Sequence, residues 1–240
     1  MEHISFRLPL PLQHLALAAA CGLGAMAVMP AAAQVAPHAA EVAAYKGLHA
    51  AAHKGDVAQI EKIIAATADL NARDGNGRTP LHVATFARQH TAIRALVKAG
   101  ADINLLDKDR YDGVTIASVA DDEDTLRVLL ALGASARQVT SRYDGTALIA
   151  AAHLGHDGVV RQLIAAGAPL DHVNNLHWTA AIEAVVLGDG GRRHQKTLQF
   201  LIAAGANLQL SDRQGNTPLQ LAKSRSYGEM VKMLEKAGAL

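Results

Sequence analysis

The chain has little cysteine and few aromatic residues. Cys21 is the one cysteine among 240 residues, and aromatic side chains make up only 3% of the sequence. A single cysteine excludes an intramolecular disulfide and a zinc site made of several cysteines. Aromatic residues usually contribute much of a large globular core. This chain is instead rich in alanine, so we expect an all-α protein of closely packed helices.

Neither sign of charge is in excess. Lysine and arginine total 23, aspartate and glutamate total 22, and the net charge is +1. No block of basic residues occurs. Proteins that bind nucleic acid or anionic membranes usually carry such a field or block. We therefore expect neither partner for the mature protein.

The first 33 residues have the pattern of an export signal. Arg7 provides a positive charge, an apolar stretch follows over residues 15–29, and three alanines precede Gln34. This order predicts a signal peptide cleaved after Ala33, then a short linker over residues 34–40. The mature protein would be periplasmic or secreted.

Two alternatives for this segment stay open. It could remain as an uncleaved membrane anchor, or Cys21 could be the lipidated residue of a lipoprotein. The second has a weaker basis, because leucine is missing three positions before the cysteine. Cleavage would leave a mature chain without cysteine, which suits an oxidising compartment.

A repeated segment decides the fold class. Two full copies read Thr-Pro-Leu-x-x-Ala, at residues 79–84 and 217–222. Weaker copies begin near residues 46, 112, 146 and 179. A Gly-Ala pair follows most copies, and its glycines are spaced 33, 34, 38 and 33 residues apart: Gly100, Gly133, Gly167, Gly205 and Gly238. Such a period predicts a solenoid of stacked units.

The segment resembles the ankyrin repeat, which has a 33-residue period and the signature T-P-L-H-x-A. The resemblance covers residues 41–240. It implies an all-α solenoid of about six helix–turn–helix repeats with projecting β-hairpin-like fingers. The repeat boundaries are approximately 41–73, 74–106, 107–140, 141–173, 174–211 and 212–240.

Individual residues of the unit have physical roles. Thr79 is expected to cap the first helix of the second repeat, and Pro80 fits the first helical position, where no donor is needed. Gly55 and Gly155 suit the left-handed turn that ends a helix. Thr67 replaces the helix-ending glycine of the first repeat. A β-branched residue resists positive φ, so we expect that turn to differ.

Several aromatic residues fall at finger positions or on the predicted concave face. Aromatic and arginine side chains are enriched at protein interfaces and their hot spots. Packing between fingers is the alternative role. The predicted partner-binding residues are Asn76, Arg78, Phe86, Asp109, Tyr111, Arg142, Tyr143, His153, Trp178 and Arg213.

Two other departures from the repeat suggest further roles. The acidic run over residues 121–124 is expected to be a solvated turn that favours the start of the next helix. The glycines and arginines of residues 188–194 are expected to form a tolerated loop, with an anion-binding nest as the alternative. Residues 142–194 are also similar to a group of bacterial ankyrin proteins, a similarity that brings no ligand or activity with it.

The sequence gives little support to a metal site or to catalysis. His49 and His82 occupy the signature position, where the resemblance implies a brace to the next finger. His53 and His153 lie three repeats apart, and a closed metal site needs three or four convergent ligands. No nucleophile elbow is present. We expect no metal, no cofactor and no catalytic residue.

The sequence therefore predicts a monomeric, non-enzymatic module that binds an unidentified protein partner. Two alternatives remain. One is an accessory protein that binds a metal or small molecule through its histidines or residues 188–194. The other is an inhibitor or immunity protein of an exported enzyme.

Overall fold

A computed structural model describes residues 35–240, so the predicted signal peptide lies outside the described residues. This part of the chain is helical throughout, with turns between the helices. Its helices are α1 (Ala39–Ala44), α2 (Gly47–Lys54), α3 (Val57–Ala65), α4 (Pro80–Phe86), α5 (His90–Lys98), α6 (Gly113–Val119), α7 (Glu123–Ala131), α8 (Ala147–Leu154), α9 (Asp157–Ala165), α10 (Ala180–Val186), α11 (Arg192–Ala203), α12 (Pro218–Ser224) and α13 (Gly228–Lys236).

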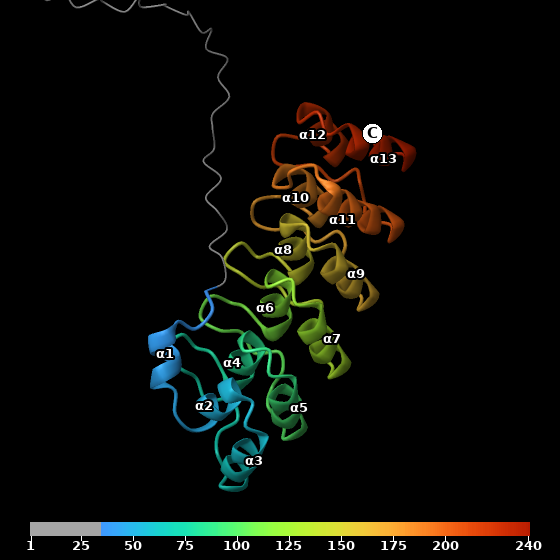
Figure 1. The fold of residues 1–240 in the computed structure, drawn as a ribbon. Coiled ribbons are helices and arrows are strands. Elements are labelled where there is room, and N and C mark those ends of the chain that lie inside the picture. Colours follow the sequence, from blue (N-terminus) through green and yellow to red (C-terminus); the bar gives the residue numbers. More distant parts are fainter. Residues whose placement is uncertain (1–34) are drawn as a thin grey trace, which may run out of the picture. The chain divides into compact units, whose positions relative to one another are not determined.

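From α2 onward, the helices form six antiparallel pairs that stack in chain order (Figure 1). The first helices of the pairs make an inner row: α2, α4, α6, α8, α10 and α12. The second helices make an outer row: α3, α5, α7, α9, α11 and α13. The turns between repeats project on the inner side as fingers. We call the side made by the inner row and the fingers the finger face. The predicted all-α solenoid is confirmed.

Side-chain caps begin most inner helices. The Thr79 hydroxyl accepts from the backbone N–H of His82 at 3.4 Å, and Pro80 follows at the first helical position, as predicted. Asp112 replaces threonine in the third repeat, and its carboxylate accepts from the N–H of Thr115 at 2.7 Å. A cap of either kind satisfies a donor that the helix leaves unpaired.

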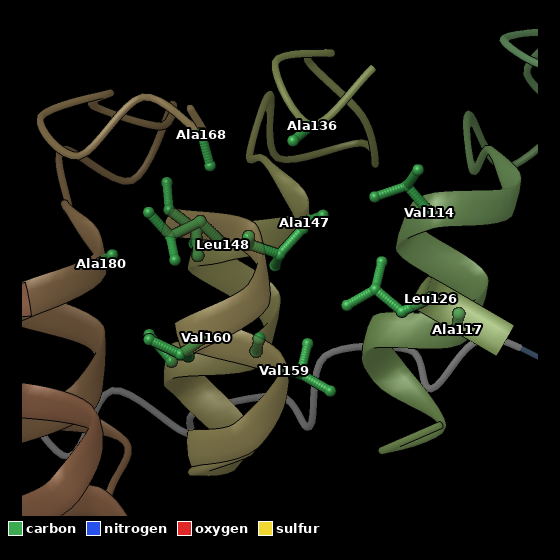
Figure 2. Packing of buried hydrophobic residues seen from close by; sticks show 14 of the residues in the cluster. Val114, Ala117, Leu126, Ala136, Ala147, Leu148, Val159, Val160, Ala168 and Ala180 are labelled. Carbon is green, nitrogen blue, oxygen red and sulfur yellow. The ribbon is translucent and has the colours of Figure 1, made fainter. Parts of the chain in front are cut away.

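The core runs through the whole stack without a break at repeat boundaries. Figure 2 shows Leu126 of α7 and Val159 of α9 pointing into the space between the third and fourth repeats, while alanines of the inner helices lie close to their neighbours. Leu148, Leu126 and Val159 are all fully buried. Small side chains let the inner helices approach, and the aliphatic residues fill the space between layers. No repeat buries its apolar face alone.

Each finger is a tight turn rather than an extended hairpin. In the second repeat the N–H of Asp74 donates to the carbonyl of Arg78 at 3.0 Å, and equivalent bonds close the later fingers. Within residues 35–240 the pairing reaches an isolated β-bridge only between Thr140 and Gly145. The predicted β-hairpin-like shape is thus reduced to a short closed turn in each finger.

The turn at Thr67 keeps one feature of the glycine turns and lacks another. Thr67 has φ 59°, in the left-handed region, and its N–H donates to the carbonyl of Ile64 at 2.9 Å, as that of Gly100 does to Val97 at 3.0 Å. After Gly100 the N–H of Ala101 also donates to Leu96 at 3.0 Å, and within the described residues Ala68 makes no such bond. The turn therefore differs, as predicted, although Thr67 does adopt a positive φ, at a cost of about 1–2 kcal/mol.

The segment predicted to be a linker is part of the fold. Ala39 and Ala40 begin α1, a helix that the repeat pattern did not predict. His38 caps it and forms a capping box with Glu41. No residue of α1 is buried. Among residues 35–240, no helix has the length and apolar character needed to cross a membrane.

Candidate functional site

The fingers of repeats three to five, residues 108–111, 142–145 and 175–178, form the middle of the finger face. We call them the central fingers. The tip of each contains a residue with positive φ: Arg110 at 65°, Asp144 at 51° and His177 at 68°. The second and sixth repeats have Gly77 and Gly215 at this position. A side chain in this conformation is strained, so the central fingers keep side chains where the backbone favours glycine.

Two ion pairs join the third finger to the fourth. Arg110 contacts Asp144 at 2.8 Å, and in the opposite direction Arg142 contacts Asp109 at 3.6 Å. All four side chains are about half exposed or more. Exposed pairs contribute little to stability. The predicted binding residues Asp109 and Arg142 are therefore accessible, and they hold each other in position.

Tyr111 and Tyr143 both lie half-buried on the central fingers. The carbonyl of Tyr111 lies 3.1 Å from the Nε2 of His82, which fixes the finger to α4. Burial raises the pKa of the Tyr111 hydroxyl, so this group stays protonated at neutral pH. The carbonyl of Tyr143 accepts from the N–H of Asn175 at 2.9 Å. Backbone contacts thus hold both fingers while their aromatic rings remain partly exposed.

Trp178 packs against the core and also remains partly exposed. Its side chain is partly buried and packs against the hydrophobic core. The backbone N–H of Trp178 donates to the side-chain oxygen of Asn174 at 3.0 Å. Leu176, two residues earlier, is 37% exposed. The fifth finger therefore combines an anchored aromatic ring with an exposed aliphatic side chain.

His153 lies beside a buried carboxylate that the sequence reasoning missed. The Nδ1 of His153 is 3.3 Å from one oxygen of Glu183, and the Asn174 amide donates to the other oxygen at 2.9 Å. Glu183 and Asn174 are each 4% exposed. The signal was present in the sequence: Val83 and Ile116 occupy the place of Glu183 in earlier repeats, and Asp74 occupies that of Asn174.

The second repeat corrects one prediction. Arg78 was expected to be a surface contact, but it is only 5% exposed. Residues 35–45 cover it: Arg78 Nη2 donates to the carbonyl of Val35 at 2.6 Å, and Nη1 lies 3.4 Å from the Glu41 carboxylate. The amide of Asn76 donates to the other oxygen of Glu41. The sequence offered no signal that the chain's own N-terminal segment lies here.

Two further predicted residues are already in contact with the chain. The guanidinium of Arg78 lies 5.3 Å from the centre of the half-buried Phe86 ring, a cation–π distance. Arg213 is exposed, and its guanidinium donates to the carbonyl of Asn175. Of the ten predicted residues only Arg78 is buried: Asp109, Arg142 and Arg213 are exposed, and the other six are partly buried.

The histidines have structural partners. The Nε2 of His49 faces the carbonyl of Arg78 at 3.0 Å, and that of His82 faces the carbonyl of Tyr111 at 3.1 Å. The implied finger braces are therefore confirmed. Within residues 35–240, no three histidine, cysteine, aspartate or glutamate side chains lie together as metal ligands would.

The loop predicted over residues 188–194 is confined to residues 188–191, because Arg192, Arg193 and His194 begin α11. The Asp189 carboxylate accepts from the N–H of Gly191 at 2.8 Å and faces the Nδ1 of His194 at 2.9 Å. A carboxylate of the chain thus fills the position that a bound anion would take. The insertion also lengthens α11, which has 12 residues where α9 has 9.

The acidic run at the start of α7 contacts the second and fifth repeats. Asp122 caps α7 and pairs with Arg88 of the second repeat at 3.2 Å. Asp121 pairs with Arg193 of the fifth repeat at 2.7 Å. The cap by Asp122 agrees with the expected start of the next helix. The two aspartates form ion pairs, however, and are not only exposed to solvent as expected.

Comparison with known proteins identifies the family. A family model of ankyrin repeats in three copies matches residues 15–107 and 114–212, and one of many copies matches residues 191–235. The chain belongs to the ankyrin-repeat family. The first match begins within the predicted export signal. Ankyrin repeats generally mediate contacts between proteins and are typically not enzymes.

Individual relatives agree with this assignment. The ankyrin repeat protein YahD of Escherichia coli K12 is 35% identical over 190 residues, covering 79% of this chain and 94% of YahD. An ankyrin repeat domain from Acinetobacter baumannii AYE is 44% identical, with a TM-score of 0.76, covering 80% of this chain and 98% of that one.

A third similar chain comes from a complex. The structure is that of the predatory endopeptidase Bd0816 from Bdellovibrio bacteriovorus with the immunity protein Bd3460. The similarity is 26% identity with a TM-score of 0.62, and it covers 80% of this chain and 98% of that chain.

Proposed function

We propose that this ankyrin-repeat protein is a non-enzymatic module that binds a protein partner through the central fingers. The observation that carries the proposal is the set of aromatic and arginine side chains that the central fingers leave partly or fully exposed: Tyr111, Tyr143, Trp178 and Arg142. On the same fingers Arg110, Asp144 and His177 hold positive φ, where Gly77 and Gly215 stand in the flanking repeats.

The chemistry of the central fingers suits protein recognition. Tyr143 and Trp178 present partly exposed aromatic surface on a rigid support, and Arg142 adds an exposed guanidinium. Tyrosine, tryptophan and arginine are the side chains most often found as interface hot spots. Because hydrogen bonds between successive fingers fix the backbone, binding requires little ordering of the chain.

We further propose that the protein acts outside the cytoplasm as a monomer. The support is the order of residues 1–33: a positive charge, an apolar stretch and small residues before Gln34. In that setting the more specific candidate is an inhibitor or immunity protein of an exported enzyme. The similarity to a chain in the endopeptidase–immunity protein complex favours this candidate.

An affinity pull-down from the native periplasmic extract tests the proposal. The baits are the mature chain, residues 34–240, and its Tyr111, Tyr143 and Trp178 triple alanine variant, with circular dichroism confirming the fold of both. A protein retained by the first bait and lost by the second is the expected result. No difference between the baits would contradict the proposal.

Two side measurements separate the alternatives. If the retained protein is a hydrolase, an assay of its activity with and without the bait tests the inhibitor candidate. Metal analysis of the purified protein tests the accessory-protein alternative, which requires bound metal near one equivalent. We expect none, since His49 and His82 brace fingers.

A further inference from the structure

The cover over Arg78 buries little apolar surface, although its Tyr45 ring stacks on that of His49 at a centroid distance of 5.7 Å. Helix α1 has no buried residue, and Val35 is 66% exposed. The contacts between this segment and the second finger are those of Val35 and Glu41 with Arg78, of Glu41 with Asn76, and of the Tyr45 hydroxyl with Asp74 at 3.0 Å. A segment that buries so little apolar surface belongs to the least stable part of a fold.

The site beneath the cover is built for a carboxylate. Arg78 is nine-tenths buried or more, and its guanidinium lies against Phe86. The Asn76 amide donates to the same Glu41 carboxylate that Arg78 contacts. Arginine, with its planar fork of donors, suits bidentate pairing with carboxylates. The other fingers have Tyr111, Gly145, Trp178 or Asn216 at the position of Arg78, so the repeat itself does not require arginine here.

The present occupant uses this site incompletely. Glu41 approaches only Nη1, at 3.4 Å, and Nη2 is taken by a neutral carbonyl. The Nε–H of Arg78 is buried and has no hydrogen-bond partner among the described residues. An unpaired buried donor costs free energy. A carboxylate in place of the Val35 carbonyl would reach Nη2 and Nε together, which is the bidentate geometry that Glu41 does not form.

We propose that Asn76, Arg78 and Phe86 form a recognition site for an acidic side chain of the protein partner, and that residues 35–45 occupy it in the free protein as a displaceable internal ligand. This inference rests on the proposed function, because it names the chemistry of a partner on the same face. Glu41 keeps the buried arginine paired until the partner's carboxylate replaces it. The open central fingers make the first contact, and the Arg78 site adds selectivity for an acidic segment.

The internal ligand lowers the apparent affinity of any competing acidic segment. When the competent state is a fraction of the molecules, the apparent Kd rises by the inverse of that fraction. Removing the charge of Glu41 weakens the internal ligand. Glu41→Gln therefore opens the site to an added acidic peptide, while Glu61→Gln, on the exposed side of α3, is a matched control that leaves it closed.

A peptide titration tests the inference. The probe is a fluorescent peptide of residues 35–46 of this chain, and a second peptide carries glutamine in place of its glutamate. By fluorescence anisotropy, we expect the probe to bind the Glu41→Gln protein about tenfold more tightly than the wild type or the Glu61→Gln control. The glutamine peptide should not bind. Adding Arg78→Met to Glu41→Gln should abolish binding of the probe, with circular dichroism verifying the fold.

Equal affinity of the probe for wild-type and Glu41→Gln protein, or equal affinity of the two peptides, would overturn the inference.

Hydrogen exchange on the wild type provides a second test. The amides of α1 should exchange at least about a hundredfold faster than those of α4, and equal protection would show a permanent cap. A protein retained in the pull-down without peptide binding would refute this inference alone. Peptide binding without a retained protein would refute only the proposed function.

Discussion

Arg78 and Trp178 occupy the same position of their repeats, immediately before the residue that caps the inner helix. Their surroundings differ. Arg78 is 5% exposed beneath residues 35–45, whereas Trp178 is half-buried and remains open to solvent on the finger face. A position in the repeat thus determines where a side chain lies, but segments outside the repeat determine whether a partner can reach it.

The two regions also treat buried charge differently. Arg78 faces a carboxylate from α1, before the first helix pair, and its Nε–H is unpaired among the described residues. Glu183 is enclosed by partners from its own and the preceding repeat, Asn174 and His153. A buried charge is tolerated only when it is paired. The incompletely paired Arg78 can therefore exchange its carboxylate partner under our proposal, whereas Glu183 keeps the partners that its own fold provides.

The largest expected effect comes from Asn174→Asp. The change removes the donor to Glu183 and places a second carboxylate beside it, so we expect a loss of about 3 kcal/mol in the free energy of unfolding. In the second repeat Asp74 is the equivalent of Asn174. No second carboxylate lies beside it, because Val83 is the equivalent of Glu183. In a Glu183→Val background the same change should cost less than about 1 kcal/mol. Urea unfolding of the four proteins measures both values, and equal costs in the two backgrounds would contradict the account.

The second comparison sets the buried arginine against an exposed one. Arg78→Met should lower the free energy of unfolding by about 2 kcal/mol, because it removes charge-assisted hydrogen bonds and leaves Glu41 without its cation. Arg142→Met should change it by less than about 0.5 kcal/mol, since that side chain is 63% exposed. Similar losses in urea unfolding would mean that the N-terminal cover is absent in solution.

A pH effect should arise at His82. Burial lowers the pKa of this imidazole, so the folded state holds it neutral. The stability that neutral His82 provides is complete above its unfolded pKa of about 6.5 and is lost as pH falls through the depressed folded value. We expect His82→Gln, which introduces the residue found as Gln220 in the sixth repeat, to cost about 1 kcal/mol at pH 7.5 and less at pH 5. Unfolding curves at the two pH values test this, and a constant difference would contradict it.

The smallest effect is expected at Thr67. Glycine adopts its positive φ without strain but loses more entropy on folding, so Thr67→Gly should stabilise the protein by about 0.5 kcal/mol net. Thr67→Ala retains a Cβ in the left-handed region and should gain less. Thermal unfolding of both variants compares them, and a destabilised glycine variant would show that the threonine side chain supports the turn.

The repeat pattern predicted the fold well because each helix is determined locally. Thr79 and Pro80 mark a helix start in any repeat, and the glycines mark helix ends. Partners from far along the chain were not predictable in this way. Glu41 contacts Arg78 37 residues later, and Arg193 contacts Asp121 72 residues earlier. The first pair depends on where α1 lies and the second on how whole repeats stack, and neither leaves a periodic signal in the sequence.

The candidate site was predicted in part for the same reason. Residues of the central fingers were placed correctly on an accessible surface, because the finger follows from the repeat. The Glu183 and Asn174 pair departs from the pattern of the neighbouring repeats, and that departure is a signal that sequence comparison between repeats would detect. The cover over Arg78 had no such signal, since α1 precedes the first helix pair and the later repeats have no equivalent helix.

The central claim is that the open central fingers carry the binding, and calorimetry of the protein retained in the pull-down tests it most directly. The titration compares the wild type with Trp178→Ala. We expect the variant to remain folded and its Kd to rise at least about 30-fold, as for the loss of an interface hot spot worth roughly 2 kcal/mol. An unchanged Kd, or a variant that unfolds, would contradict the claim and make Trp178 a packing residue of the solenoid.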